Sequence, residues 1–410
     1  MSDVFPRLLV ATEFAPNASG GGAAVVRQML KDWPADKLFW WSCFPETDRR
    51  FGQSVSRHYV TPIPRGWYPN QRWCGPKSWI LENVWSPWAT SRFRRVLREV
   101  SPDVVWAIPH GWSIPPVAGA LVKSGRDFHV SMHDYMNIES YAARYGVERS
   151  ERLAAAQIRL YGAAKSHDAI CREMAEDLNR QTGRQDISIT RMGLEEEDFA
   201  YLELPPAPTH VSIRIAYAGS IQVQDEFALL VAALTQIKSR LARPLSLDLF
   251  GDHSNRSRPW FDASWMVEHG NLPVPQLMAA LRQCDWGFSP MALTDHDPRY
   301  NRFSLPTKFV SYLAAGLPVI ALGHRESSVV KMATAYEVGL GLEDGDVDRL
   351  AERLLTALST EDSRLKFRPG IRNCAGREFD ARQMRGRLHD CFRQIGQLSS
   401  TSTNRRKAPQ

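Results

Sequence analysis

Short apolar runs alternate with amphipathic segments along most of the chain, and this alternation limits the possible folds more than any other feature. Buried strands of a parallel sheet are short and continuously apolar, and helices connect them. In the first half, the predicted strands are residues 7–12, 37–42, 103–108, 128–132, 168–171 and 187–190. In the second half, the predicted strands are 213–218, 245–250, 286–289 and 318–322, and the predicted helices are 225–239, 274–283, 306–315 and 347–358. The sequence therefore predicts an α/β fold in which helices cover both faces of parallel sheets.

A proline-rich stretch divides this pattern into two halves. It reads Glu-Leu-Pro-Pro-Ala-Pro-Thr from residue 203, and three prolines in four positions exclude a helix or a central strand. Ligands of open parallel sheets bind at the carboxyl ends of the strands, so we expect a site in a cleft between the halves. The predicted parts are an N-terminal domain (1–202), a linker (203–210), a C-terminal domain (211–378), a helix packing back towards the first domain (379–398) and a disordered tail (399–410).

Composition excludes several classes of protein. The 410 residues suffice for two or three domains, and 43% hydrophobic with 23% charged residues excludes a disordered or fibrous chain. No apolar run approaches the ~18 residues that span a bilayer, so we expect a cytoplasmic protein. The six cysteines form no CxxC pair, which argues against a disulfide framework or a zinc knuckle. Cations and aromatic residues gather in one region without a recognition motif, so nucleic-acid binding is not expected.

Three consecutive glycines, Gly20, Gly21 and Gly22, follow the first predicted strand and precede helical sequence. Glycine lets backbone N–H groups approach an anion at a helix N-terminus, where the helix dipole favours negative charge. A phosphate is therefore the expected ligand of this turn. The run matches neither GxGxxG nor the Walker pattern, and a flexible loop is the alternative interpretation.

His133 ends another predicted strand of the first half, and Asp134 follows it. A histidine at the carboxyl end of a parallel strand can donate a hydrogen bond to a substrate near neutral pH, and Asp134 could orient the ring. The alternative is a purely structural His-Asp pair.

A third feature lies in the second half, where Pro306-Thr307-Lys308 opens a predicted helix that stops at Gly316. The N–H groups of Thr307 and Lys308 lie at the positive end of that helix beside an ammonium group, which predicts a second anion site. The nearby run from Asp295 to Asp297 reads Asp-His-Asp, and we interpret it as a solvated loop rather than a metal site.

The segment from Pro306 through Ala-Ala-Gly-Leu-Pro-Val-Ile-Ala, which ends at Ala321, resembles the donor-binding segment of the family 4 retaining glycosyltransferases. Tyr-Ala-Gly-Ser from Tyr217, Leu-Asp-Leu-Phe-Gly from Leu247 and His-Gly-Asn-Leu from His269 resemble their nucleotide-domain strands and base-binding loop. The resemblance implies the GT-B fold, with two Rossmann-like α/β domains facing each other across a central cleft. It also implies these donor-binding residues: Gly20, Gly21, Gly22, Gly219, Ser220, Gly251, Asn271, Leu272, Ser304, Thr307, Lys308 and Ser311.

Two departures from the family stand out. Phe303 and Ser311 occupy the places where most members carry an acidic pair, and the run from Ser220 to Glu226 lacks the usual Arg and Lys. Lys308 is the first candidate for a replacement cation on the diphosphate, and Arg302 or Arg299 the second.

The resemblance implies transfer of a sugar from a nucleotide diphosphate to an acceptor hydroxyl, with retention and without a metal or other cofactor. His133 would lie beside the transferred sugar as the catalytic residue. The acceptor would be a growing glycan, a lipid-linked sugar or a polysaccharide. Two other functions stay open: a nucleotide-sugar 2-epimerase-like isomerase, and a non-catalytic GT-B partner subunit.

Tryptophans and cations gather between residues 65 and 98. This composition suits stacking on a sugar acceptor through Trp67, Tyr68 and Trp73, or peripheral contact with an anionic membrane at its inner face. The alternative is a loop that packs its own aromatic side chains on the first domain. Arg92, Arg95 and Arg98 share one side of a predicted helix, which could simply be its solvated face.

Overall fold

The computed structural model describes residues 5–18, 20–45, 54–64, 73–204, 211–360 and 363–406. The chain forms two compact units: Met1–Arg191 with Gln383–Gln410, and Met192–Arg382. Each unit contains one six-stranded sheet, and every strand pairing is parallel. The α/β prediction with parallel sheets is confirmed.

The first unit has the strand order β3-β2-β1-β4-β5-β6. Its strands are β1 (Leu8–Ala11), β2 (Leu38–Ser42), β3 (Arg57–Val60), β4 (Val104–Ala107), β5 (Phe128–Met132) and β6 (Ser166–Ala169). β3 was not predicted, because this edge strand is partly exposed and its sequence Arg-His-Tyr-Val is not an apolar run. The predicted strand 187–190 is wrong, since it contributes only an isolated bridge between Ala169 and Ile189.

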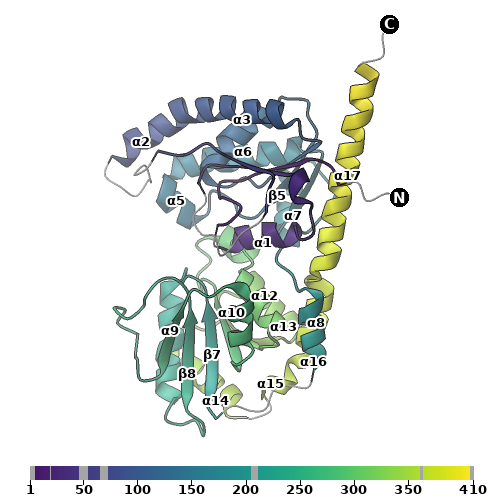
Figure 1. Ribbon diagram of the computed structural model, residues 1–410. Coiled ribbons are helices and arrows are strands. Elements are labelled where there is room, and N and C mark those ends of the chain that lie inside the picture. Colours follow the sequence, from purple (N-terminus) through teal and green to yellow (C-terminus); the bar gives the residue numbers. More distant parts are fainter. Residues whose placement is uncertain are drawn as a thin grey trace. The chain divides into compact units, whose positions relative to one another are not determined.

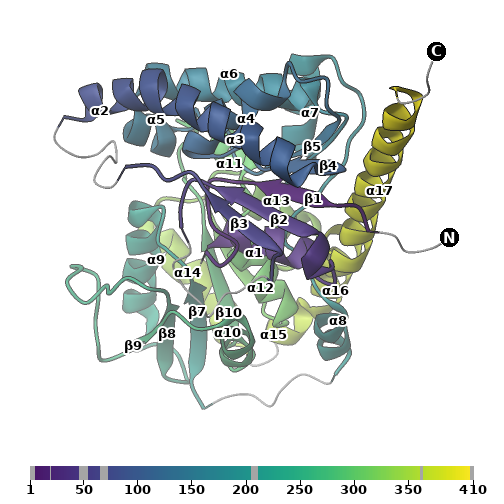
Figure 2. The same ribbon diagram turned by 45° about the horizontal axis from the view of Figure 1, so that its top comes forward.

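Helices cover both faces of the first sheet. Its helices are α1 (Gly21–Met29), α2 (Cys74–Ile80), the π-helical turn η3 (Leu81–Trp85), α3 (Ser86–Val100), α4 (Ile114–Leu121), α5 (Glu139–Tyr145), α6 (Val147–Ala163) and α7 (Arg172–Thr182), with short 3-10 turns η1 (Ala35–Lys37) and η4 (Gly111–Ser113). The chain leaves β1 and β4 towards opposite sheet edges, so right-handed crossovers place α1 on one face and α3, α4 and α6 on the other (Figures 1 and 2).

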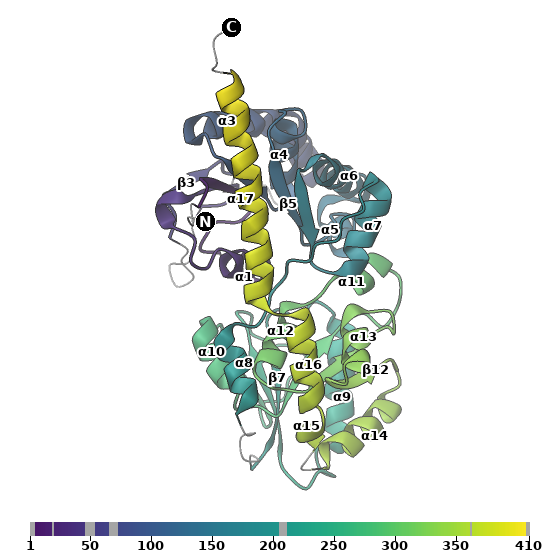
Figure 3. The same ribbon diagram turned by 90° about the vertical axis from the view of Figure 1, so that its right-hand side faces the viewer.

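The last helix, α17 (Ala381–Arg406), returns to the first unit and lies beside α1 (Figure 3). His389 Nε2 contacts the carbonyl oxygen of Met29 at 2.8 Å. The ring of Phe392 lies 5.7 Å from that of Trp33 and 5.4 Å from that of Trp106, measured between centroids. The backbone stays helical to Arg406, which differs from the disorder predicted after residue 398.

The second unit has the strand order β12-β11-β10-β7-β8-β9. Its strands are β7 (Ile213–Ala218), β8 (Leu245–Phe250), β9 (Met266–Gly270), β10 (Trp286–Pro290), β11 (Val319–Leu322) and β12 (Gly339–Leu342). The two edge strands were not predicted. β9 is largely exposed and takes in His269 and Gly270, which the sequence had assigned to a loop. In β12, a side chain at Gly339 would collide with the backbone of Val319, so glycine allows these strands to pair closely.

The helices of the second unit are α8 (Glu196–Glu203), α9 (Gln224–Ile237), α10 (Val274–Leu281), α11 (Pro298–Phe303), α12 (Thr307–Ala314), α13 (Ser328–Ala335), α14 (Val347–Leu358), α15 (Ser363–Lys366) and α16 (Arg368–Glu378). α9 packs on α14, whereas α12 packs on α8 and α16. The chain leaves β7 and β10 in opposite directions, so α9 and α12 cover opposite faces of the sheet. α8 ends at Glu203, and residues 205–210 of the predicted linker lie outside the described residues.

Among the described residues, five cysteines form no disulfide: Cys43, Cys171, Cys284, Cys374 and Cys391. Within the described ranges, no helix has both the length and the apolar content needed to cross a bilayer.

Candidate functional site

In the first unit, the turn after β1 brings the predicted glycines to the start of α1. Gly20 has φ 133°, a conformation that favours glycine, and it caps the helix that begins at Gly21. From the second turn of α1, Arg27 donates a 2.6 Å hydrogen bond to the carbonyl of Ala18 and thereby fixes the turn. A Cβ at Gly22 would lie 3.6 Å from Nδ1 of His133. Gly22 and His133, predicted separately, therefore lie side by side.

His133 follows β5 and carries a neutral ring at pH 7. Its pKa is lowered to about 4, mainly by burial; Asp168 opposes the shift and the neighbouring His110 adds to it. Its Nε2 atom is buried and makes no hydrogen bond within the described part of the chain. Asp134 does not hydrogen-bond to it there, so the predicted orienting role of Asp134 has no contact behind it. Burial raises the pKa of Asp134 to about 6.

A second polar pair lies in the same unit and was missed from the sequence. Glu13 follows β1 and His110 follows β4, and their carboxylate Oε2 and ring Nδ1 are 2.9 Å apart. The other carboxylate oxygen accepts the N–H of Trp112 at 2.8 Å, and His110 Nε2 lies 2.6 Å from the hydroxyl of Tyr141. A side chain at Gly111, which has φ 49°, would overlap the Glu13 carboxylate. This pair occupies the point where the chain leaves neighbouring strands in opposite directions, a usual ligand position in open sheets.

In the second unit, three strands end together around closely packed glycines. Gly219 has φ 99°, and its N–H donates to the carbonyl of Phe250 at 2.6 Å. The N–H of Gly251 donates to the carbonyl of Gly270 at 3.0 Å, and a Cβ at Gly251 would lie only 3.1 Å from the carbonyl oxygen of Gly219. The backbone is therefore open to close approach at the carboxyl ends of β7 and β8.

Lys308, in the first turn of α12, reaches this group of strand ends. Its Nζ donates to the hydroxyl of Tyr217 at 2.6 Å, lies 3.9 Å over the Tyr217 ring centroid and is 3.4 Å from the carbonyl oxygen of Ser220. Burial without a carboxylate partner lowers the pKa of Lys308 to about 7. The structure thus places Lys308 beside Gly219 and Ser220.

The remaining predicted donor residues of this unit lie around α12 or after β9. Thr307 opens α12, but the Ser311 hydroxyl donates to the Thr307 carbonyl at 3.2 Å and is engaged within the helix. The carbonyl of Ser304 accepts the hydroxyl of Ser328. Asn271 and Leu272 are half-buried between β9 and α10, and Leu272 packs on the core.

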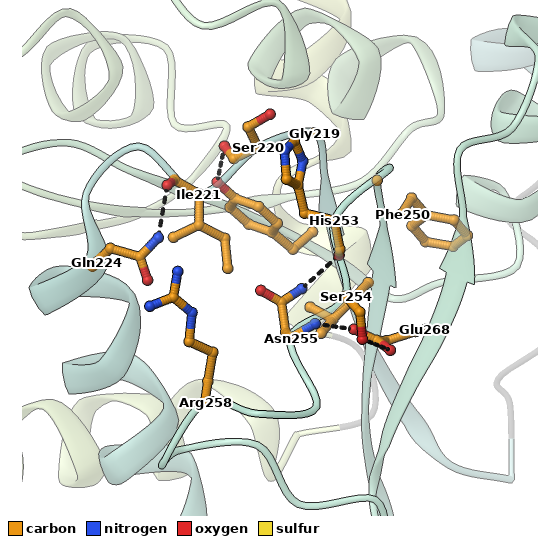
Figure 4. A pocket seen from close by; sticks show the side chains of 13 residues that line it. Gly219, Ser220, Ile221, Gln224, Phe250, His253, Ser254, Asn255, Arg258 and Glu268 are labelled. Carbon is orange, nitrogen blue, oxygen red and sulfur yellow. Dashed lines mark hydrogen bonds between the residues drawn. The ribbon is translucent and has the colours of Figure 1, made fainter. Parts of the chain in front are cut away.

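A cavity of about 250 Å³ opens at the carboxyl ends of β7 and β8. Figure 4 shows the Arg258 side chain entering it between Gln224 and Asn255, with His253 on the side of Gly219 and Ser220. Glu268 forms one wall, and its carboxylate holds the 251–258 loop by accepting the N–H of Asn255. The lining residues are Tyr217, Gly219, Ser220, Ile221, Gln224, Leu249, Phe250, Gly251, His253, Ser254, Asn255, Arg258 and Glu268.

Three predicted donor residues, Gly219, Ser220 and Gly251, line this cavity, and Lys308 contacts two of its walls. The sequence did not indicate Arg258 or Gln224, because the loop that carries Arg258 has no regular pattern.

The Asp-His-Asp run forms part of a structured loop. Asp297 caps α11 by accepting the N–H of Tyr300 at 3.2 Å, and Asp295 Oδ2 lies 3.4 Å from Nη2 of Arg302. Across the ranges that the structure describes, no group of three or more His, Cys, Asp or Glu residues is arranged to hold a metal.

One of the three predicted acceptor residues lies in the part of the chain that the structure describes. Trp67 and Tyr68 lie outside the described residues, whereas Trp73 is described and 66% exposed.

Comparison with known proteins identifies the fold. Residues 212–360 match the family Glycosyl transferases group 1. No curated protein matches the sequence.

HepE of Anabaena, solved with UDP and glucose, is similar over 95% of this chain and 100% of its own, with a TM-score of 0.64 and 13% identity. Sucrose-phosphate synthase of Thermosynechococcus elongatus is similar over 95% of this chain and 98% of its own (TM-score 0.68, 15% identity). An α,α-trehalose-phosphate synthase (UDP-forming) of Burkholderia xenovorans is similar over 94% and 100% (TM-score 0.63, 13% identity). The expected GT-B fold is confirmed.

Proposed function

We propose that this chain, which has the GT-B fold and matches the group 1 glycosyltransferases over residues 212–360, transfers a sugar from a nucleotide diphosphate to an acceptor hydroxyl. One observation carries the proposal: Lys308 at the start of α12 reaches the glycine-lined ends of β7 and β8, beside the cavity. A half-buried cation, a helix N-terminus and open backbone together suit a diphosphate. The HepE structures contain UDP and UDP-glucose, so a uridine diphosphate sugar is the first donor to test.

The second unit would hold the donor. The diphosphate would lie against the first turn of α12 and Lys308, and the nucleoside would extend over Gly219 and Gly251 towards the cavity. A bound diphosphate places negative charge beside Nζ and favours the ammonium form of Lys308, which burial alone disfavours. Lys308 would thereby become a charged partner for the leaving group.

In the proposed reaction, the bond between the anomeric carbon and the diphosphate oxygen breaks, and the acceptor oxygen forms the new glycosidic bond on the same face. The acceptor proton passes to the departing phosphate oxygen, so no enzymic nucleophile and no metal is required. The main task of the protein is to stabilise the negative charge on the nucleoside diphosphate. His133 would position the sugar, because its neutral ring can hydrogen-bond without adding positive charge next to a sugar carbon that becomes electron-poor.

A growing glycan, a lipid-linked sugar or a polysaccharide is the proposed acceptor, and a hexosyl group is the proposed transferred sugar. The proposed site of action is the cytoplasm, where nucleotide sugars would be available.

A thermal-shift panel of UDP, GDP, ADP and TDP with their common sugar conjugates tests donor binding. A nucleotide at about a hundred times its Kd adds roughly 2.7 kcal/mol to the free energy of unfolding, which a shift in melting temperature reveals. Lys308→Ala should weaken that nucleotide about 10- to 100-fold, the range for a lost charge-assisted hydrogen bond.

Lys331→Ala is the matched control and should leave affinity unchanged. Lys331 is a half-exposed lysine on α13 that pairs with Glu326. A chain that no nucleotide stabilises would contradict donor binding. Turnover of a nucleotide sugar into an epimer without any acceptor would contradict transfer and favour the isomerase.

A further inference from the structure

The helical run from α2 through η3 to α3 has one side buried in the first unit and one side open. Leu81, Trp85 and Phe93 pack inwards, and Trp85 Nε1 donates to the carbonyl of Pro62 at 3.0 Å. The outer side carries large apolar side chains that are not covered. We call them the tryptophan face: Trp73 (66% exposed), Trp79 (60%), Val84 (55%) and Trp88 (47%). Of the described tryptophans in this region, Trp85 is buried on the first unit, whereas Trp73, Trp79 and Trp88 are largely exposed.

This exposure is unusual for so many large apolar side chains on one helical run. Single exposed apolar residues are common on protein surfaces, whereas a contiguous group marks an interaction site. Figures 1 and 2 both show α2 and α3 in line along the outside of the first unit. From residue 73 to residue 88 the run extends about 22 Å at 1.5 Å per residue. The tryptophan face is thus a long line rather than a pocket.

The same run is strongly basic. Residues 74–100 contain five cations, Lys77, Arg92, Arg94, Arg95 and Arg98, against two carboxylates, Glu82 and Glu99. Arg92, Arg95 and Arg98 are exposed, and the Arg92 guanidinium lies 5.8 Å from the Trp88 ring centroid.

Both carboxylates are already neutralised by arginines from other segments. Glu82 pairs with Arg149 at 2.9 Å and with Arg152 at 3.0 Å, and Glu99 pairs with Arg57 at 2.8 Å. Neither carboxylate of the run is therefore left to offset the charge of Arg92, Arg95 and Arg98 on the exposed side of α3, and the partner of this surface should be anionic.

We propose that the tryptophan face and the arginines of α3 form a docking surface for a bilayer that contains anionic phospholipid. Tryptophan settles at the boundary between headgroups and acyl chains, since its ring is apolar and its N–H is polar. Arginine fits lipid phosphates, and interfacial helices combine tryptophan with cationic side chains that reach the headgroups. A line of three tryptophans suits a flat partner, whereas a single sugar ring would occupy only one of them. This inference does not depend on glycosyl transfer.

Vesicle co-sedimentation of the full chain tests the proposal. We expect binding to vesicles in which about a third of the phosphatidylcholine is replaced by phosphatidylglycerol, and little binding to phosphatidylcholine alone. Trp79→Ser with Trp88→Ser should reduce binding to the anionic vesicles about tenfold or more, because the apolar anchor is lost. Arg92→Ser with Arg95→Ser should do the same, and added salt should mimic it.

Matched controls come from exposed positions elsewhere: Val147→Ser on α6, and Arg382→Ser with Arg387→Ser on α17. These should bind vesicles as the wild type does, and a melting temperature within a few degrees of the wild type shows that each variant folds. Quenching of tryptophan fluorescence by brominated lipid should fall in the Trp79 and Trp88 double variant. Equal binding by the double variants and the controls would overturn the proposal. So would a wild-type chain that ignores anionic vesicles, or one whose tryptophan face instead forms a concentration-dependent dimer.

Discussion

Lys308 combines a half-buried ammonium with a neutral partner, the Tyr217 hydroxyl, and this makes nucleotide affinity depend on pH. Its pKa of about 7 lies below the ordinary 10.5, so the folded apo chain loses the charge as pH rises above 7. A bound diphosphate needs the charged form. Affinity should therefore fall by up to about tenfold per pH unit above pH 7, and binding should take up a proton there.

Lys308→Arg provides the control, because arginine keeps its charge over this range. Isothermal titration in buffers of different ionisation enthalpy measures the proton uptake directly. The variant should bind with a flat pH profile between about pH 7 and 9. An equally steep profile in wild type and variant would assign the titration to another group.

Glu13 and His110 form a hydrogen-bonded pair whose contribution to stability should also depend on pH. Burial lowers the His110 pKa, but the hydrogen bond and charge of Glu13 raise it more, so the net pKa lies above 6.5. A raised histidine pKa contributes stability that is present below 6.5 and is lost as pH rises through the folded value. Glu13→Gln should therefore lower the free energy of unfolding more at about pH 6 than at about pH 8, by roughly 1 to 3 kcal/mol at the lower pH.

Urea unfolding at the two pH values measures this difference, and NMR titration of the His110 ring should show its pKa falling in the variant. An equal loss at both pH values would mean that the pair is not ionic. The sequence could place Glu13 and His110 only after predicted strands. It could not pair them, because 97 residues separate them and no local pattern encodes the contact.

His133 is expected to act on the sugar rather than on the nucleotide. Its Nε2 has no hydrogen-bond partner among the described residues, and its Nδ1 lies beside Gly22. His133→Ala should lower kcat about a hundredfold, the scale for a lost positioning contact, and leave nucleotide affinity within about twofold. Release of UDP or another nucleoside diphosphate from its sugar conjugate measures turnover whichever acceptor is used. Unchanged turnover would remove His133 from the mechanism.

Among the strands, those in the sheet interiors were predictable, whereas three of the four edge strands, β3, β9 and β12, were not. The interior strands β1, β4, β7 and β10 are buried and mainly apolar, and such runs predict buried strands directly. β3 and β9 are edge strands with polar or exposed residues, and β12 alternates glycine with leucine. Such strands form because a neighbouring strand offers hydrogen-bonding groups, which is tertiary information. The glycine turn at residues 20–22, His133 and Gly219 were predictable for the same reason as the interior strands, since each follows a buried strand.

The helix α17 is the element whose packing is most open to test. Phe392 is fully buried among Trp33, Trp106 and His129, whose ring centroids lie 5.4 to 5.7 Å away. Phe392→Ala should cost about 3 to 5 kcal/mol, the usual range for a buried phenylalanine. Arg387→Ala on the exposed side of α17 should change stability by less than about 0.5 kcal/mol. Urea unfolding of both variants measures these changes in the free energy of unfolding. A small effect of Phe392→Ala would mean that α17 detaches readily from the rest of the first unit.

At the scale of the whole molecule, the two units must act on one donor if the glycine turn of the first and Lys308 of the second both serve the diphosphate. That joint role rests on the sequence motifs and stays a prediction. Hydrogen exchange with mass spectrometry can test it, because a bound anion slows the exchange of amides that it contacts. Saturating nucleotide sugar should protect residues 219–224 and 307–310, and also residues 20–24 of the first unit.

The pattern of protection separates the possible outcomes. Lys308→Ala should remove protection from all three segments at the same ligand concentration, because it weakens binding of the whole ligand. Gly21→Val should remove protection only around residue 20, since a branched side chain hinders backbone approach there and leaves the second unit intact. Protection confined to the second unit in the wild type would show that the glycine turn serves another purpose. The second unit would then bind the donor, and the first unit would bind the acceptor.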